Sequence, residues 1–195
     1  MKVYVNLLYF PVKVLGPGER VGLWLQGCTI RCKGCMSNHT WEFEDKYLME
    51  VEHLVEKINQ LPSDKLTVSG GEPFDQPQAL QEILKGVRKT KKDILVYTGY
   101  SYRKVESNWK DILNYADVLI TEAFVEGMDT DLIWKGSDNQ MMIILNKELE
   151  ANYLKFMKEK KTKTLQIAKS EGFIHLLGIP YQKDLKELYK LYMSQ

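Results

Sequence analysis

The stretch Gly27–Trp41, with the sequence GCTIRCKGCMSNHTW, organises our interpretation of the rest of the chain. It contains all three cysteines of the protein, Cys28, Cys32 and Cys35, in a C-x3-C-x2-C array. Thiolates are soft ligands that suit iron–sulfur clusters and zinc. Spacings of three and two residues let one tight loop supply three ligands to a single metal centre. On a four-iron cluster, three cysteines would leave the fourth iron open to a small molecule.

Three alternative roles for the cysteines compete with a cluster. A disulfide framework is disfavoured, because three is an odd number and the chain is neither short nor rich in cysteine. A structural zinc site made of the three cysteines and His39 is compatible with the spacing. Unrelated buried cysteines are the third alternative, since free cysteine behaves as a small hydrophobe. The array alone favours a cluster, and the rest of the chain supplies the context for that hypothesis.

Length and composition limit the classes of protein that need to be considered. With 195 residues, of which 44% are hydrophobic, the chain can bury a proper core, and we expect residues 1–195 to form a single domain. Its 27 Lys and Arg nearly balance its 26 Asp and Glu, which gives no sign of a nucleic-acid partner or a polybasic membrane surface. No apolar run approaches the ~18 residues of a membrane span. Reduced cysteines without an export signal indicate a cytoplasmic protein.

Apolar patterns along the chain predict alternating strands and helices. The expected strands are Val3–Phe10, Arg20–Gln26, Lys65–Ser69, Asp93–Tyr97, Asp117–Thr121, Met141–Leu145 and Gly172–Leu177. The expected helices run from Tyr47 to Ile58, from Pro77 to Val87 and from Tyr102 to Tyr115, with a last helix carrying Leu185, Leu188, Tyr189 and Tyr192 on one face. Such alternation is typical of a parallel α/β sheet. Because a full eight-unit barrel takes about 250 residues, we expect a partial, open (β/α)6-like barrel of mostly parallel strands.

A second motif, Ser69-Gly70-Gly71-Glu72-Pro73, follows the strand Lys65–Ser69. Paired glycines let the backbone approach a ligand closely. The cysteine loop, this motif and Thr98–Tyr100 all come directly after predicted strands. Since loops at the carboxyl ends of parallel strands build the site in such folds, we expect the three to converge on one face.

Together these motifs carry a resemblance to a known family. C-x3-C-x2-C followed by Gly-Gly-Glu-Pro resembles the radical S-adenosylmethionine enzymes. More narrowly, the chain is similar to the small activating enzymes of glycyl-radical proteins, best known from the anaerobic ribonucleotide reductase system. The matching segments, in order, are Gly16-Pro17-Gly18-x-Arg20, Gln26-Gly27-Cys28, Cys32-x-Gly34-Cys35 with Thr40-Trp41, Ser69–Pro73, Tyr97–Tyr100, Gly136-Ser137-x-Asn139-Gln140 and Gly178-Ile179-Pro180. They span roughly residues 15 to 180.

The chain also departs from the family pattern. Leu15 replaces the usual Asp before Gly-Pro-Gly, and Ser37 stands where Asn is usual, with Asn38 beside it. The usual Asp-Gly-Pro-Phe segment is here Thr121–Phe124, and Lys135 replaces the more usual Arg. None of these departures touches the cysteine triad or Gly-Gly-Glu. They bear on the choice of protein substrate rather than on the cofactor.

The resemblance implies a cofactor chemistry and a set of contacts. Cys28, Cys32 and Cys35 would hold a [4Fe–4S] cluster, whose fourth iron binds S-adenosylmethionine and delivers one electron to it, giving methionine and a 5′-deoxyadenosyl radical. The implied cofactor-binding residues are Ser69, Gly70, Gly71 and Glu72 for the methionyl end, Thr98, Ser137 and Asn139 for ribose or carboxylate, and Leu176 and Gly178 in the segment Phe173–Gly178 that frames the adenine. For that last segment a plain hydrophobic strand is an equally good interpretation.

The resemblance also implies partners. The radical would take a hydrogen atom from a backbone glycine of a large partner enzyme. No further cysteines are present for an auxiliary cluster, so an outside one-electron donor such as flavodoxin or ferredoxin would supply the electron. Two alternatives stay open: a radical enzyme acting on a small molecule or peptide, and a non-enzymatic zinc or iron–sulfur module. We expect Trp24, Trp41 and Tyr97 to be packing residues.

Overall fold

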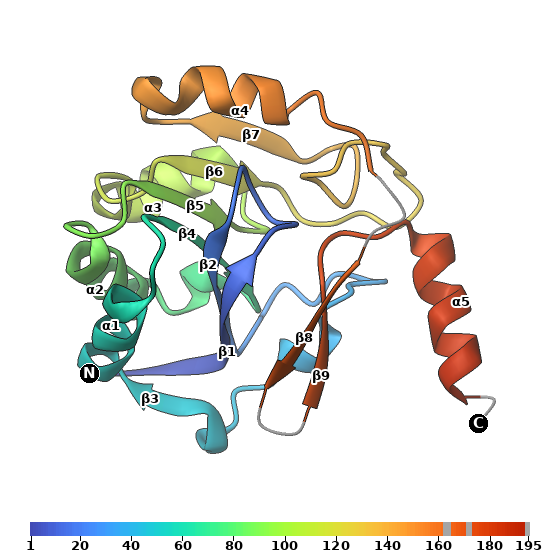
Figure 1. Ribbon diagram of the computed structural model, residues 1–195, viewed down its shortest axis with the longest axis horizontal. Coiled ribbons are helices and arrows are strands. Elements are labelled where there is room, and N and C mark those ends of the chain that lie inside the picture. The colour runs from blue at the N-terminus through green and yellow to red at the C-terminus, as the bar shows by residue number, and fades with distance from the viewer. Residues whose placement is uncertain (162–164, 171–172, 194–195) are drawn as a thin grey trace.

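The computed structural model, which describes residues 1–161, 165–170 and 173–193, contains one mixed sheet of seven strands in the order β3-β1-β2-β4-β5-β6-β7 (Figure 1). The central strands β2 (Arg20–Leu25), β4 (Lys65–Gly70), β5 (Asp93–Tyr97) and β6 (Val118–Thr121) are parallel. The strands β1 (Lys2–Val12), β3 (Leu48–Glu50) and β7 (Met141–Ile144) are antiparallel to their neighbours. The predicted α/β class with mostly parallel strands is confirmed. The sheet is open, with β3 and β7 at its two edges.

Three helices cover one face of the sheet. These are α1 (Val51–Gln60), α2 (Pro77–Val87) and α3 (Tyr102–Leu113), which lie side by side in Figure 1. Each presents an apolar stripe to the strands, and the shared core includes Leu54, Leu84 and Val105. Pro77 stands in the first turn of α2, where its missing N–H costs no helical hydrogen bond. Strand β2 is buried along its whole length because its other face is covered as well.

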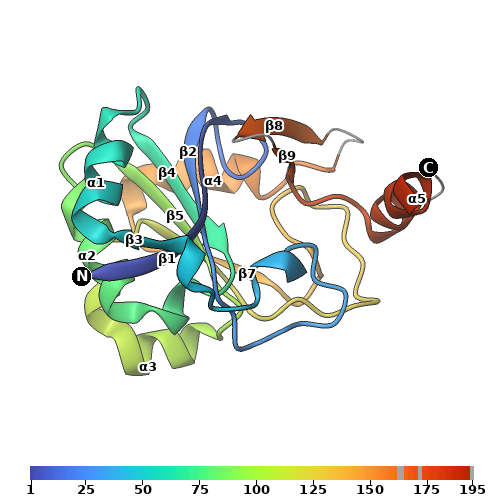
Figure 2. The same ribbon diagram turned by 90° about the horizontal axis from the view of Figure 1, so that it is seen from below.

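The opposite face is covered by elements from the last third of the chain. Helix α4 (Glu150–Phe156), preceded by the 3-10 turn η4 (Lys147–Leu149), packs Tyr153 and Phe156 against β5 and β6. A hairpin of β8 (Gln166–Ser170) and β9 (Phe173–Leu177) packs Ala168 and Leu177 against Trp24. Helix α5 (Gln182–Met193) lies at the end of the molecule away from α1–α3 (Figure 2). None of the helices within the described ranges has the length and apolarity that crossing a membrane requires.

Two predictions about elements are corrected, and the direction of one predicted strand, β7, is a new finding. The span Gly172–Leu177 was expected to close the series of sheet strands, but β9 pairs only with β8, in a hairpin, and Gly172 lies outside the described residues. Strand β7 is antiparallel, because no helix intervenes between it and β6 to carry the chain back for a parallel return. The first helix begins at Val51 rather than Tyr47, since Leu48–Glu50 pairs with β1 instead.

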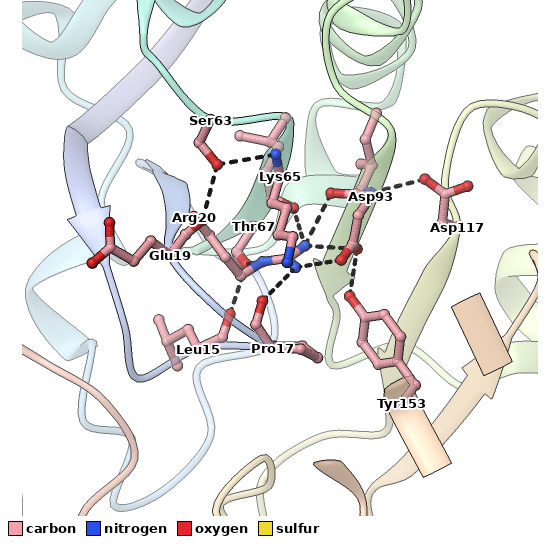
Figure 3. A network of polar contacts seen from close by, with 12 residues as sticks. Leu15, Pro17, Glu19, Arg20, Ser63, Lys65, Thr67, Asp93, Asp117 and Tyr153 are labelled. Carbon is pink, nitrogen blue, oxygen red and sulfur yellow. Dashed lines mark hydrogen bonds and ion pairs between the residues drawn. The ribbon is translucent and has the colours of Figure 1, made fainter. Parts of the chain in front are cut away.

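A buried polar network anchors the amino ends of the central strands (Figure 3). The Arg20 guanidinium, with no exposed surface, donates two hydrogen bonds to the Asp93 carboxylate at 2.7 and 2.9 Å. It also donates to the Thr67 hydroxyl at 2.7 Å and to the Leu66 carbonyl at 2.8 Å. The Tyr153 hydroxyl donates to Asp93 at 2.6 Å. These contacts tie β2, β4, β5 and α4 together at the end opposite the cysteine loop, so that the loops at the carboxyl ends start from a fixed frame.

Candidate functional site

The cysteine loop leaves β2 and returns through the 3-10 turn η1 (Asn38–Thr40). Gly27 begins the loop with φ +100°, a conformation that favours glycine. Its N–H donates to the Thr40 carbonyl at 2.7 Å, and the Cys28 N–H donates to the Trp41 carbonyl at 2.9 Å. The two ends of the loop are therefore held side by side. All three cysteines are free thiols and are partly buried.

The loop after β4 packs directly on the start of the cysteine loop. The Gly71 N–H donates to the Leu25 carbonyl and the Glu72 N–H donates to the Gly27 carbonyl, each at 2.8 Å. A Cβ on Gly71 would lie 2.0 Å from the Gly27 carbonyl oxygen. We predicted that the paired glycines allow close approach to a ligand. What Gly71 approaches in the structure is the backbone next to Cys28, and glycine is required there for that reason.

The Glu72 carboxylate joins the loop after β4 to the loop after β5. It accepts hydrogen bonds from the Phe74 N–H at 3.0 Å, the Thr98 hydroxyl at 2.7 Å and the Gly99 N–H at 2.7 Å. The side chain is buried, and burial raises its pKa to about 7, although the three donors act to lower it. Glu72 and Thr98 thus use their polar atoms on each other and on the backbone.

Asp75 is a residue of the site that we did not predict from the sequence. It lies in the 3-10 turn η3 (Pro73–Asp75) and accepts hydrogen bonds from the Thr29 N–H at 2.6 Å and from the Tyr100 hydroxyl at 2.6 Å. It therefore connects the cysteine loop, the loop after β4 and the loop after β5. The signal available in the sequence was a carboxylate two residues after Pro73, but its partners are distant in the chain.

These loops enclose a cavity of about 200 Å³. The predicted site residues on its wall are Cys28, Cys32, Cys35, Ser69, Gly70, Gly71, Glu72, Thr98, Leu176 and Gly178. The expected convergence of the three loops on one face is confirmed. Leu176 and Gly178 reach the cavity from the β8–β9 hairpin rather than from a strand of the main sheet. Ile174 of the same strand is 72% exposed, so β9 is not a plain buried strand.

Ser137 and Asn139 do not line this cavity; their neighbours Gly136 and Gln140 do. The Ser137 hydroxyl is buried and accepts from the Val125 N–H at 3.0 Å. The Asn139 side-chain amide donates to the Ala123 carbonyl at 2.8 Å. Both side chains hold the loop after β6 in place.

That loop contains a strained residue, Glu122, which lines the cavity with φ +81°. A non-glycine residue in the left-handed region is uncommon. Its backbone is fixed by neighbours: its N–H donates to the Tyr100 carbonyl, and its carbonyl accepts from the Gln140 amide at 3.0 Å. The family usually has glycine at this position, which matches the observed backbone conformation.

Comparisons with known proteins agree with this geometry. A family model described as a 4Fe-4S single cluster domain matches residues 14–143. The anaerobic ribonucleoside-triphosphate reductase-activating protein of Haemophilus influenzae is 36% identical over 148 residues, which cover 70% of this chain and 95% of that protein. The proteins of the same name from Vibrio cholerae and Enterobacteria phage T4 are each 34% identical, over 69% and 66% of this chain and 94% and 86% of theirs. The chain belongs to this family of radical S-adenosylmethionine activating enzymes.

The resemblance inferred from the cysteine array and Gly-Gly-Glu is therefore confirmed, and the chain is an enzyme of the radical S-adenosylmethionine type. Among solved structures, QueE from Escherichia coli aligns over 50% of this chain and 52% of its own, with 18% identity and a TM-score of 0.45.

The thiols fit the cluster that the family model describes. Burial raises the pKa of Cys28, Cys32 and Cys35, because a low-dielectric wall disfavours an uncompensated thiolate. Bound iron supplies the missing positive charge and deprotonates a coordinating thiol. Within the described ranges no three His, Cys, Asp or Glu side chains converge on one metal ion. A cubane presents its irons at separate corners, so its ligands do not need to converge on one point.

The zinc alternative fits less well. His39 lines a neighbouring cavity along β1 and β9, together with His175, and is absent from the wall that carries the cysteines. Burial, and to a smaller extent the nearby His175, lowers the pKa of His39. Among the described residues His39 and the three cysteines do not come together as a group that could hold one metal ion.

Proposed function

We propose that Cys28, Cys32 and Cys35 hold a [4Fe–4S] cluster and that S-adenosylmethionine binds beside it in the cavity between the loops after β2, β4 and β5. The observation that carries this proposal is the shared wall: three free thiols and the Gly70–Glu72 backbone face one cavity in a chain of the activating-enzyme family. The chemistry that the bound cluster supplies is one-electron reduction of S-adenosylmethionine to methionine and a 5′-deoxyadenosyl radical.

The protein's own residues would bind and position S-adenosylmethionine and shield it from water. The Gly70 and Gly71 backbone and Ser69 lie on the wall where the methionyl end would sit, and Glu72 with Thr98 fixes that wall. Leu176 and Gly178 close the opposite side and exclude water from the reacting atoms. We assign residues 1–195 to one radical S-adenosylmethionine domain, and we assign the open sheet with its parallel central strands to the partial barrel of that fold.

The protein partner that we propose is an anaerobic ribonucleoside-triphosphate reductase, since the relatives are named as activators of that enzyme. A backbone glycine of the partner would give up a hydrogen atom, leaving 5′-deoxyadenosine and a glycyl radical. The electron for each event would come from an outside carrier such as flavodoxin or ferredoxin, because the three cysteines of the chain are all engaged at one centre.

The test is anaerobic reconstitution with iron and sulfide, followed by dithionite and S-adenosylmethionine, with 5′-deoxyadenosine measured by mass spectrometry. We expect production that is lost in Cys32→Ala and kept in His39→Ala. Adding an anaerobic ribonucleoside-triphosphate reductase should then produce the doublet of a glycyl radical in its EPR spectrum.

The outcomes separate the parts of the proposal. Cleavage without a glycyl radical would exclude the reductase as partner and leave another substrate. A cluster that does not cleave S-adenosylmethionine would refute the radical function. Stoichiometric zinc that is lost in His39→Ala would refute the cluster itself.

A further inference from the structure

Trp41 holds a buried hydrogen-bond donor that has no partner. Its indole Nε1 is one of three buried side-chain polar atoms in the described part of the chain without a hydrogen bond. A buried polar group left unpaired costs free energy, and in native proteins such a group calls for a functional explanation. From the sequence we expected Trp41 to be a packing residue, and packing does not explain an unpaired N–H.

The backbone of Trp41 is fixed against the cysteine loop. Its carbonyl accepts from the Cys28 N–H at 2.9 Å, and its N–H donates to the Asn38 carbonyl at 3.2 Å. Thr40 beside it is buried and is hydrogen-bonded to both Gly27 and Ser37. The Trp41 backbone is therefore held at the closing end of the cysteine loop, next to Cys28.

The third cysteine is the sulfur closest in role to the indole N–H, because Trp41 and Cys35 share one cavity wall and Trp41 is a group that acts on the Cys35 thiol. Trp41 lines the same cavity wall as Cys35. Burial raises the pKa of the Cys35 thiol, while the backbone at Ser37 and the Trp41 indole N–H act to lower it. Among the described residues Nε1 makes no hydrogen bond to this sulfur or to any other acceptor. A negatively charged, cluster-bound sulfur is the acceptor that this donor lacks.

We propose that the Trp41 indole N–H donates a hydrogen bond to the Cys35 sulfur when that sulfur ligates the cluster, and that this bond raises the reduction potential of the cluster. The inference rests on the cluster part of the proposed function. Its physical basis is charge: the reduced cluster carries one more negative charge than the oxidised cluster, so a donor to a cluster sulfur stabilises the reduced form more. Trp41 is then a positioning residue that makes the first electron easier to accept.

The test compares Trp41→Phe with the wild type by an EPR-monitored redox titration of the reconstituted protein. Phenylalanine keeps an aromatic ring and removes the N–H. At a fixed potential we expect the ratio of reduced to oxidised cluster to fall threefold to tenfold, which is a midpoint lower by about 30–60 mV at 59 mV per tenfold for one electron. The matched control is Trp24→Phe, because Trp24 lines the same cavity and has no contact with a cysteine sulfur among the described interactions.

A midpoint that is unchanged in Trp41→Phe, or lowered equally in Trp24→Phe, would overturn the inference while leaving the proposed function intact. If Trp41→Phe fails to fold or to take up iron, the Trp41 indole can be examined in a protein that retains it. With ¹⁵N-labelled tryptophan in the Trp24→Phe background, the reduced cluster should show a ¹⁵N coupling in pulsed EPR. Absence of that coupling would refute the hydrogen bond. Failure of the wild type to take up any cluster would refute the proposed function instead.

Discussion

Gly71→Ala should separate the cysteine loop from the loop after β4. The added Cβ would lie 2.0 Å from the Gly27 carbonyl oxygen and 2.7 Å from its carbonyl carbon. Real Cβ contacts are almost never shorter than 3.0 Å, so one backbone has to move by at least 1.0 Å, the difference between 3.0 and 2.0. Both contacting groups are backbone, and no side chain can rotate to make room.

The loss of stability in Gly71→Ala can be worked out from the hydrogen bonds at this contact. A shift of that size takes the 2.8 Å bonds from Gly71 to Leu25 and from Glu72 to Gly27 beyond hydrogen-bond distance. Each lost bond costs about 0.5–1.5 kcal/mol, and a buried group left unpaired costs about 1–3 kcal/mol. We therefore expect the free energy of unfolding to fall by about 2–5 kcal/mol. The displaced loop should also lose iron, because Cys28 is the residue after Gly27.

Urea unfolding and the iron and sulfide content after reconstitution measure the two effects. The control is Gly127→Ala, since Gly127 has φ +88° but nothing within 4 Å of an added Cβ. That variant has the backbone strain of a left-handed alanine, about 1–2 kcal/mol, and should keep its full iron content. If Gly71→Ala takes up as much iron as the wild type and unfolds at the same urea concentration, the contact between the two loops does not hold the site.

Three further sets of substitutions test the buried Arg20–Asp93 network and the loops of the site. Asp93→Ala leaves the buried Arg20 guanidinium without its carboxylate and should lower the free energy of unfolding in urea by about 3–5 kcal/mol. In the double variant Arg20→Met with Asp93→Leu, the free energy of unfolding should fall by less than the sum of the two single changes. The folded pKa of Glu72 is raised from 4.5 to about 7, so its proton-linked stabilisation is complete below about pH 4.5 and is lost as pH rises through 7. The stability advantage of wild type over Glu72→Gln should therefore shrink across that window by on the order of 3 kcal/mol, and a difference independent of pH would contradict this reasoning. Glu122 has a left-handed backbone, whose strain costs a non-glycine residue about 1–2 kcal/mol. Glu122→Gly removes this strain, while the greater freedom of glycine in the unfolded chain costs about 0.5–1 kcal/mol. The melting temperature should therefore rise in Glu122→Gly and should not rise in Glu122→Ala.

The sequence was sufficient to predict which loops meet at one edge of the sheet. The buried strand Arg20–Gln26 followed by cysteines, and Lys65–Ser69 followed by paired glycines, predicted two loops at the same edge of a parallel sheet, which the cavity confirms. The reason is that the carboxyl ends of neighbouring parallel strands coincide whatever the other details of the fold. Which atoms the glycines approach did not follow, since the answer is the Gly27 backbone, more than 40 residues away in sequence.

The elements after residue 143 were harder to predict. Phe173–Leu177 has the length and apolar content of a sheet strand, and nothing local distinguishes a sheet member from one half of a hairpin. The two-residue spacing between β8 and β9 was the missed signal, because such spacing is typical of hairpins. Asp75 was missed for a related reason: Thr29 and Tyr100 lie 46 and 25 residues from it, so only the folded chain shows what it joins.

The carboxylates of the site hold the loops together, and this changes how its motif should be understood. Both Glu72 oxygens accept from Phe74, Thr98 and Gly99, and Asp75 accepts from Thr29 and Tyr100. Groups that are already satisfied within the protein have little left to offer a ligand, so the structure favours a role for Glu72 and Asp75 in placing the loops rather than in direct contact with a cofactor. Trp41 differs from these two carboxylates: its buried N–H has no partner, and the acceptor that we propose for it is the Cys35 sulfur when that sulfur ligates a cluster.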